Sequence, residues 1–226
     1  RDSVASRGRG DVYKRQPYRY GGGYLEMMFR GAEAIVESVK WNGLDVISKV
    51  RNPRSYRHPA LEKRLVQERM RSEVRIIEKL ISNGLAVPLL YSVDVANSQI
   101  IMEFLEGTTL EQALRGKDFE KNLVDTAELL ASIHSQGVIH GDPTTSNFIV
   151  NEKIHAIDFG LAGISEDDEA RASDLRVLLE SLDSHHSEIR GRDIFLKAYS
   201  EWPNSSSVLD ALNVLELRGR YNLMRG

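Results

Sequence analysis

Two polar stretches decide how this chain folds, HGDPTTSN at residues 140–147 and IDFG at residues 157–160. Asp142 and Asn147 lie five residues apart in the first stretch, and Asp158 follows an apolar segment in the second. Phosphoryl transfer needs such a set, because one carboxylate orients the attacking hydroxyl while an amide oxygen and a second carboxylate hold Mg²⁺ ions on the nucleotide phosphates. The pair of stretches therefore predicts a kinase-like site with ATP and Mg²⁺ as cofactors.

The segment between the two stretches supports this interpretation. Residues 148–150 and 154–157 are apolar and flank Asn151-Glu152-Lys153, which is typical of a hairpin. A hairpin here brings residues 147 and 158 onto neighbouring backbone, as shared metal ligation requires. We therefore predict Asn147 and Asp158 as metal ligands and Asp142 as the catalytic carboxylate.

The bulk composition excludes several other classes of function. The chain has 226 residues, a net charge of −3 and no cysteine, so it offers no disulfide, no thiolate chemistry and no cysteine zinc site. A near-neutral charge gives no reason to expect nucleic acid or a membrane surface as a direct partner. No apolar run approaches the roughly 20 residues of a membrane span. These properties predict a soluble cytoplasmic protein of one large domain or two small lobes.

The first part of the chain differs from the rest. Residues 1–26 are rich in arginine, include Gly21-Gly22-Gly23 and have no periodic apolar face. A basic arm or an arginine-rich transit peptide is one interpretation. We expect instead a disordered or non-native extension, because nothing in the segment can form a core.

Residues 27–104 have the pattern of a β-rich lobe with one long helix. Residues 27–29, 35–40 and 46–50 are predicted strands, and Asn42-Gly43 between the last two is a strong hairpin signal. Residues 86–95 and 99–104 are two further predicted strands, the first interrupted by Pro88. The helix is predicted over residues 59–81, with Pro59 in its first turn and Asn83-Gly84 as its stop.

One lysine and one glutamate of this lobe are candidate partners. Val66, Glu73, Ile77 and Leu80 share one helix face, which puts the carboxylate of Glu73 on an apolar stripe. A charge there is costly unless it is paired, and Lys49, which ends an apolar strand, is the natural partner. An inward-facing Lys49 would also meet the nucleotide phosphates, although most strand lysines face solvent.

Other charged residues of the lobe are expected in solvent. Glu62, Glu68 and Glu78 have mostly polar helix neighbours. Arg51, Arg54 and Arg57 follow the third strand and are expected in a solvated basic loop.

Two segments are candidates for contact with the nucleotide. The turn between the first two strands has a single glycine, so that an ordinary hairpin turn is an equally good interpretation; its residues are Gly31, Ala32, Glu33 and Ala34. The composition changes from strand-rich to helix-rich near residue 104, which we predict as the lobe boundary, with residues 105–226 forming the second lobe. Extended backbone from Glu103 to Leu105, with Met102 beside it, is placed to hold the edge of an adenine.

The second lobe is predicted to be helical over residues 109–114, 119–135, 169–182 and 208–217. A helix begins almost at once after Gly160, without an A-P-E motif, and Gly141 stands where protein kinases carry an arginine. Control by phosphorylation of an activation loop is therefore not expected. Asp174 is expected either to anchor the catalytic loop through backbone N–H groups or to be an exposed helix acid. The end of the chain is a small basic patch with Arg218, Arg220 and Arg225.

Several of these residues together resemble one family, the small atypical kinase of the KEOPS complex, whose animal form is called PRPK. The resemblance covers about residues 28–221. It is carried by MFRGAEA (28–34), YRHP (56–59), HGD with TTSN (140–142 and 144–147), IDFGL (157–161) and RGR (218–220). It implies an α+β fold, a minimal bilobal kinase with a β-rich N-lobe, one long helix and a reduced helical C-lobe.

The resemblance also implies a function and a set of roles. Such a protein would bind ATP and Mg²⁺, act as a Ser/Thr kinase or ATPase, and partner the TsaD-type transferase and other KEOPS subunits that make threonylcarbamoyl-adenosine on tRNA. Lys49 and Glu73 would form the phosphate-positioning ion pair, Asp142 would be the base or the carboxylate that orients water, and Asn147 and Asp158 would hold metal. The basic C-terminal tail would reach toward the transferase or its tRNA.

One residue departs from the family pattern. The family usually has leucine where this chain has Pro143. A proline there biases Asp142 toward extended backbone and removes one N–H, which is expected to shift the carboxylate and lower turnover. All predicted phosphate and metal ligands are present, so we do not infer an inactive enzyme.

Two alternatives remain from the sequence. A small-molecule phosphotransferase of the aminoglycoside- or choline-kinase kind also uses H-G-D, but the 66 or so residues after Gly160 leave little chain for a substrate-binding subdomain. A non-catalytic module that uses ATP only to set its shape is the other alternative.

Overall fold

The computed structural model describes residues 28–30, 34–51, 58–186 and 190–223. The predicted extension at residues 1–26, the turn residues Gly31 to Glu33, and Arg54, Arg57 and Arg225 lie outside the described residues.

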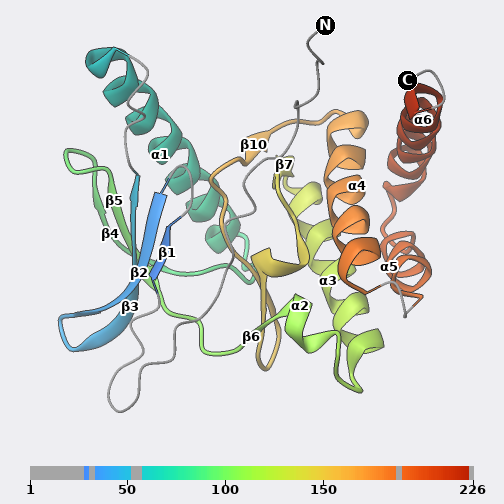
Figure 1. Cartoon of the computed structure of the whole chain (residues 1–226), viewed down its shortest axis with the longest axis horizontal. Coiled ribbons are helices and arrows are strands. Elements are labelled where there is room, and N and C mark those ends of the chain that lie inside the picture. Colours follow the sequence, from blue (N-terminus) through green and yellow to red (C-terminus); the bar gives the residue numbers. More distant parts are fainter. Residues whose placement is uncertain (1–27, 31–33, 52–57, 187–189, 224–226) are drawn as a thin grey trace, which may run out of the picture.

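An antiparallel sheet of five strands forms one side of the molecule (Figure 1). Its order is β1-β2-β3-β5-β4, with β1 Met28–Arg30, β2 Ala34–Trp41, β3 Leu44–Arg51, β4 Leu90–Asp94 and β5 Gln99–Glu103. Strand β3 is central, so Lys49 is flanked by Val36 of β2 and Ile100 of β5. A lysine on a central strand has its backbone fixed on both sides, and this fixes the origin of its side chain.

The turns of the sheet follow the local sequence. Asn42 and Gly43 both have positive φ, 49° and 85°, and Trp41 pairs with Leu44, as the Asn-Gly signal predicts. The prediction for residues 86–95 was wrong in its first part, since the strand begins only at Leu90. Pro88, which lacks an N–H, lies in the irregular segment before it.

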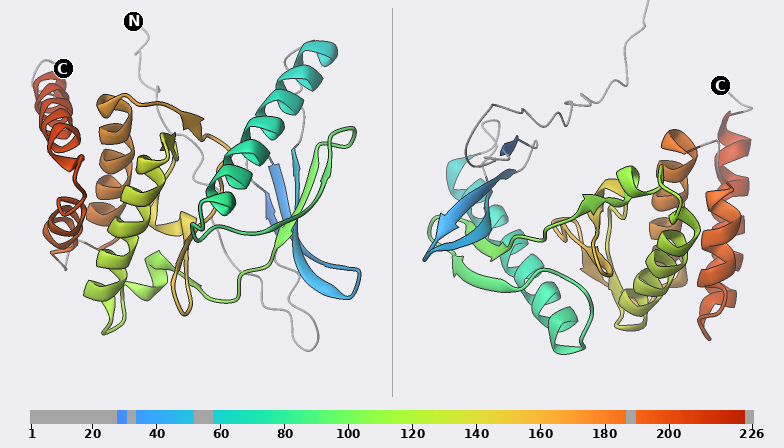
Figure 2. Two further views of the ribbon diagram at one scale, coloured as in Figure 1. Left: turned by 180° about the vertical axis from the view of Figure 1, so that it is seen from behind. Right: turned by 90° about the horizontal axis from the view of Figure 1, so that it is seen from below.

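Helix α1, Pro59–Ser82, lies against the sheet and continues toward the second lobe (Figures 1 and 2). Its predicted apolar face is buried, with Glu73 among the buried residues. Glu62 is a correction: it is 3% exposed, not solvated. It lies in the first turn of α1, and its polar sequence neighbours gave no sign of this burial.

The second lobe packs helices against short strands. Strands β6 Thr108–Thr109, β8 Phe148–Val150 and β9 Ile154–Ala156 form one small sheet, and β7 Val138–Ile139 pairs with β10 Gly163–Ile164. The helices are α2 Leu110–Ala113, α3 Phe119–Ser135, α4 Asp168–His185, α5 Gly191–Tyr199 and α6 Ser205–Leu223, with a 3₁₀ turn at Thr145–Asn147. In Figure 2, α3, α4 and α6 lie side by side in layers.

The main hydrophobic core lies in this lobe and reaches into the last turns of α1. Ile76, Ile77 and Leu80 of α1 join buried residues of α3, α4, α5 and α6. A smaller cluster in the first lobe holds Met70, Ile100 and Met102. Because α1 contributes to the larger core, it ties the two lobes together around the catalytic loop.

Helix α5 was not expected from the sequence. It is nine residues long and buries Phe195 and Tyr199 against α3. Helix α6 is also longer than the predicted 208–217, because Ser205 begins it earlier and it runs to Leu223. Among the described helices, none combines the length and the hydropathy needed to span a membrane.

Candidate active site

Three elements bring the predicted phosphate and metal residues together. Nζ of Lys49 on β3 lies 2.5 Å from Oε1 of Glu73 on α1 and 2.7 Å from Oδ1 of Asp158, which follows β9. The side chains of Lys49 and Glu73 are 7% and 1% exposed, whereas that of Asp158 is 50% exposed. The lysine thus faces inward, and the Asp158 carboxylate remains open to solvent on one side.

Mutual attraction keeps these groups charged. Burial acts to lower the pKa of Lys49, but Glu73 and Asp158 outweigh it and leave that pKa raised above its ordinary value. Burial likewise acts to raise the pKa of Asp158, yet the charge and hydrogen bond of Lys49 and the N–H of Gly160 hold it below its ordinary value. Both residues are therefore ionised at neutral pH.

The catalytic loop is held by the side chain of Asn147. Its Nδ2 donates to the main-chain oxygen of Asp142 at 2.8 Å and to Oδ2 of the same residue at 3.1 Å. Thr144 N also donates to the Asp142 oxygen at 2.8 Å. None of these bonds uses an N–H of residue 143, so the structure holds Asp142 in place with Pro143 buried beside it. The predicted effect of Pro143 on turnover stays a prediction.

Asp174 of α4 anchors the start of the same loop through its backbone N–H groups. Its Oδ2 and Oδ1 accept hydrogen bonds from His140 N at 2.6 Å and Gly141 N at 2.8 Å. Of the two roles considered for Asp174, the structure thus shows the anchor. His134 is buried and joins Asp174 Oδ2 to the hydroxyl of Tyr199.

His140 connects the two polar stretches. Its Nε2 lies 3.1 Å from the Ile157 carbonyl, and its Nδ1 accepts from Asp142 N at 3.4 Å. Its ring also lies 4.8 Å from the ring of Phe159. Burial lowers the pKa of His140, against the smaller raising effects of the nearby carboxylates, so the ring is neutral and donates through Nε2.

The residues present fit a magnesium ion. Asp158 has a left-handed backbone, φ 63°, which turns its carboxylate out of the strand direction. The amide N–H₂ of Asn147 donates to Asp142, so the side-chain carbonyl oxygen of Asn147 is the atom that can face a cation. Within the described ranges no group of three or more His, Cys, Asp or Glu could hold a metal. Mg²⁺ on nucleotide phosphates needs only one or two such protein oxygens.

Arg51 is a site residue that the sequence analysis placed wrongly. It ends β3, and its side chain is 4% exposed with Nη2 at 2.5 Å from Oε2 of Glu73. Residues two apart on a strand point to the same side, so the inward prediction for Lys49 already implied an inward Arg51. The basic residues that follow in sequence hid this signal.

Of the residues predicted to contact the nucleotide, the structure describes Ala34, Met102, Glu103 and Leu105 but not residues 31–33. Ala34 begins β2 opposite Arg51. Met102 is buried with Met70 and Ile100. Glu103 closes β5, and its carboxylate accepts from Leu89 N at 3.0 Å; Leu105 follows in the linker between the lobes. Contact of these residues with an adenine stays a prediction.

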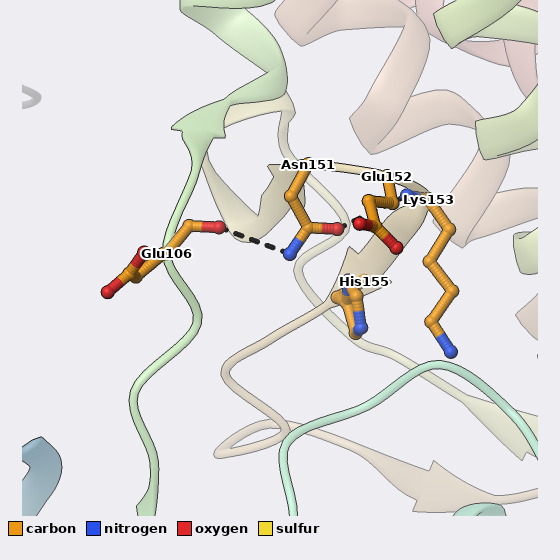
Figure 3. A pocket seen from close by; sticks show the side chains of 5 residues that line it. All are labelled: Glu106, Asn151, Glu152, Lys153 and His155. Atoms are coloured by element: carbon orange, nitrogen blue, oxygen red, sulfur yellow. Dashed lines mark hydrogen bonds between the residues drawn. The ribbon is translucent and has the colours of Figure 1, made fainter.

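A hollow of about 330 Å³ opens beside this linker (Figure 3). It is lined by Glu106, Asn151, Glu152, Lys153 and His155, and Asn151 donates to the Glu106 carbonyl at 3.1 Å. Asn151, Glu152 and Lys153 form the turn of the β8–β9 hairpin, whereas Asn147 and Asp158 lie beyond its open end. The hollow is therefore separate from the catalytic residues.

Comparison with known proteins identifies the family of this chain. The family described as ABC1 atypical kinase-like domain matches residues 41–190. The KEOPS complex subunit Bud32 of Pyrococcus abyssi is 34% identical over 212 residues, which is 87% of this chain and 96% of that protein. The corresponding subunit of Encephalitozoon cuniculi is 37% identical over 193 residues, covering 85% and 94% of the two chains.

The chain belongs to the Bud32 family of atypical kinases. The resemblance inferred from the sequence motifs is thereby confirmed. It also matches a probable bifunctional tRNA threonylcarbamoyladenosine biosynthesis protein of Methanospirillum hungatei JF-1, 37% identical over 196 residues. That match covers 85% of this chain but 36% of the relative, so the chain spans about a third of the length of such bifunctional relatives.

Solved structures confirm the predicted kinase-like fold. The Rio2 kinase of Chaetomium thermophilum, in an ADP/Mg²⁺-phosphoaspartate complex, superposes with a TM-score of 0.62 over 86% of this chain and 70% of that one. A second structure of that kinase gives 0.63. At 14% identity these likenesses show the fold alone.

Proposed function

We propose that this chain is an ATP- and Mg²⁺-dependent kinase or ATPase that acts in a KEOPS-type complex in support of threonylcarbamoyl-adenosine modification of tRNA. One observation carries the proposal: Lys49, Glu73 and Asp158, from three elements far apart in sequence, meet within 2.7 Å at a loop that carries Asp142 and Asn147. An ion pair that only stabilises the fold does not need a second carboxylate and an amide side chain beside it. Phosphoryl transfer does, because positioning and charge stabilisation supply nearly all of its catalysis.

Each side chain has a role in that chemistry. Glu73 orients the ammonium group of Lys49 toward the α- and β-phosphates. Asp158 and the amide oxygen of Asn147 would hold Mg²⁺, which supplies charge neutralisation at the phosphates when bound. Asp142 accepts or orients the proton of the attacking hydroxyl, and the Asn147 amide fixes its carboxylate at 3.1 Å. The acceptor is water or a Ser/Thr hydroxyl.

Family membership supports the wider setting. The relatives of Pyrococcus abyssi and Encephalitozoon cuniculi are named as KEOPS subunits, and the bifunctional relatives are named for threonylcarbamoyladenosine biosynthesis. We infer a TsaD-type transferase as the partner, with tRNA reached through the complex. The basic end of α6, from Arg218 onward, is the proposed contact region. The same membership speaks against an aminoglycoside- or choline-type phosphotransferase.

The proposal is tested by ATP turnover of the full chain with and without Mg²⁺, and with and without the transferase and tRNA. Asp142→Asn and Asp158→Ala should abolish turnover, and Asp193→Asn, an exposed carboxylate of α5, should leave it unchanged. Turnover that is equal in all variants would refute the catalytic assignment. Rapid phosphorylation of an aminoglycoside or choline would favour the small-molecule phosphotransferase instead.

A further inference from the structure

Glu73 is shared between two cations that come from one strand. Lys49 Nζ lies 2.5 Å from its Oε1, and Arg51 Nη2 lies 2.5 Å from its Oε2. The carboxylate is 1% exposed, and both cationic side chains are buried as well. A phosphate-positioning ion pair needs one lysine and one glutamate, so the arginine is an addition to it.

The charges explain what the addition achieves. Lys49, Arg51, Glu73 and Asp158 make two cations and two carboxylates in contact, which is neutral as a set. In the proposed reaction Lys49 turns partly toward phosphate and Asp158 toward Mg²⁺. Glu73 would then be a buried anion whose first partner is engaged elsewhere, a costly state. Arg51 keeps a full positive charge on the second oxygen throughout.

Arg51 also reaches the backbone after Asp158. Its Nη2 lies 3.4 Å from the Gly160 carbonyl, and thus joins α1, β3 and the segment that carries the metal-binding carboxylate. A Cβ on Gly160 would stand 2.9 Å from Arg51 Nη2 and 3.1 Å from Asp158 Oδ1. The absence of a side chain at residue 160 therefore leaves room for the guanidinium group.

We infer that Arg51 is a positioning residue for phosphoryl transfer: it holds Glu73, and through it Lys49, in register with Asp158 by bridging Glu73 to the Gly160 carbonyl. The inference rests on the proposed ATP-dependent function. Arg51 acts without touching the reacting atoms, so it should govern kcat more than the KM for ATP. In protein kinases a long activation segment controls the position of the catalytic groups. Here a fixed contact of Arg51 would do so instead.

The test is a double-mutant cycle in the full chain, with kcat, the KM for ATP and the thermal midpoint as readouts. Arg51→Gln should lower kcat by about 10- to 30-fold and change the KM by less than about threefold, since a small misplacement of catalytic groups costs up to about a hundredfold. Arg51→Lys, which keeps a positive charge for the buried Glu73 carboxylate, should restore kcat to within about threefold of wild type. Arg64→Gln, an exposed arginine of α1, is the matched control and should behave as wild type.

The cycle separates positioning from general destabilisation. In a Glu73→Gln background, Arg51→Gln should cost less than about twofold in kcat, because the partner it acts through is gone. A full loss in that background, or a loss that Arg51→Lys does not relieve, would overturn the inference. Additive shifts of the thermal midpoint in the same cycle would overturn it without any reference to turnover. A wild-type chain without Mg²⁺-dependent turnover would instead overturn the proposed function.

Discussion

Two buried carboxylates at the catalytic loop are compensated in different ways. Glu73 is neutralised by the cations Lys49 and Arg51. Asp174, also 2% exposed or less, instead accepts two backbone N–H bonds and contacts His134. Of the two cations, Lys49 also contacts Asp158 and can turn toward other anions, whereas the backbone N–H groups at Asp174 are fixed by the chain. The first arrangement suits a site that exchanges partners with a nucleotide, and the second suits a loop that must stay fixed.

The largest expected effect is on turnover, and it comes from the cluster of Lys49, Glu73 and Asp158. Asp158→Ala should lower kcat by about a thousandfold, because it removes a proposed Mg²⁺ ligand. Its side chain is 50% exposed, so the thermal midpoint should change little. Steady-state ATP hydrolysis and a thermal melt of the same sample measure both. A large fall in the midpoint would show that Asp158 is structural and would remove the contrast.

Asp174→Asn should affect stability more than Asp158→Ala does. The substitution keeps the shape but replaces one acceptor oxygen by an N–H₂ group that faces a backbone donor, which should cost about 2–4 kcal/mol of unfolding free energy. Turnover should also fall, since His140 and Gly141 lose their anchor. Urea unfolding measures the change. Asp193→Asn, exposed on α5, is the control and should cost less than about 0.5 kcal/mol.

A smaller effect is expected on the pH dependence of stability, and it comes from His140 in the loop that Asp174 anchors. The pKa of buried His140 is lowered below its ordinary 6.5, so the unfolded chain binds the proton more readily than the folded one. This contribution to stability is complete above the unfolded pKa and is lost as the pH falls below about 6.5, by up to about 1.4 kcal/mol per pH unit.

Unfolding free energies measured between pH 7.5 and about pH 5 test this sign. His140→Gln should flatten the acid slope, and His185→Gln, exposed at the end of α4, should leave it as in wild type. An unchanged slope in His140→Gln would mean that another group governs the acid loss. The Lys49–Asp158 pair should not contribute in this range, because its raised lysine pKa and lowered aspartate pKa keep both charges constant.

The smallest effect on stability is expected at Arg218, which lies in neither the Glu73 cluster nor the loop that Asp174 anchors. Arg218 of α6 pairs with Glu169 of α4 at 3.0 Å, with both side chains more than half exposed. Arg218→Ala should change the unfolding free energy by less than about 0.5 kcal/mol and leave basal ATP turnover unchanged. Reduced binding to the proposed transferase partner, measured by calorimetry, is the expected effect. A stability loss beyond about 1 kcal/mol would show that this pair belongs to the packed core.

Local sequence signals predicted most of the fold. The Asn42-Gly43 turn, helix α1 and helix α3 follow from turn chemistry and periodic apolar residues. Helix α5 was missed because nine residues give too short a period to recognise, and its burial depends on packing against α3. Strands β6 and β10 have two residues each and exist only through their partners.

The site divides in the same manner. Asp142, Asn147 and Asp158 follow from motif spacing, and Glu73 follows from a charge on an apolar stripe. Arg51 and Glu62 were assigned to solvent because their sequence neighbours are polar. Strand periodicity could have shown the burial of Arg51, because it lies two residues after Lys49 on the same strand. The burial of Glu62 had no such signal in its helix neighbours.

The sequence by itself determined the family and the proposed chemistry, because a family pattern, the candidate oxygen ligands for Mg²⁺ and the candidate phosphate-binding lysine are matters of residue type and spacing. The tertiary structure decided how the charges are shared. It placed Arg51 on the second oxygen of Glu73 and set Asp174 beneath the backbone of His140 and Gly141. The physical reason is that an ion pair or an anchor depends on distances of a few ångströms between segments tens of residues apart, and only packing fixes those distances.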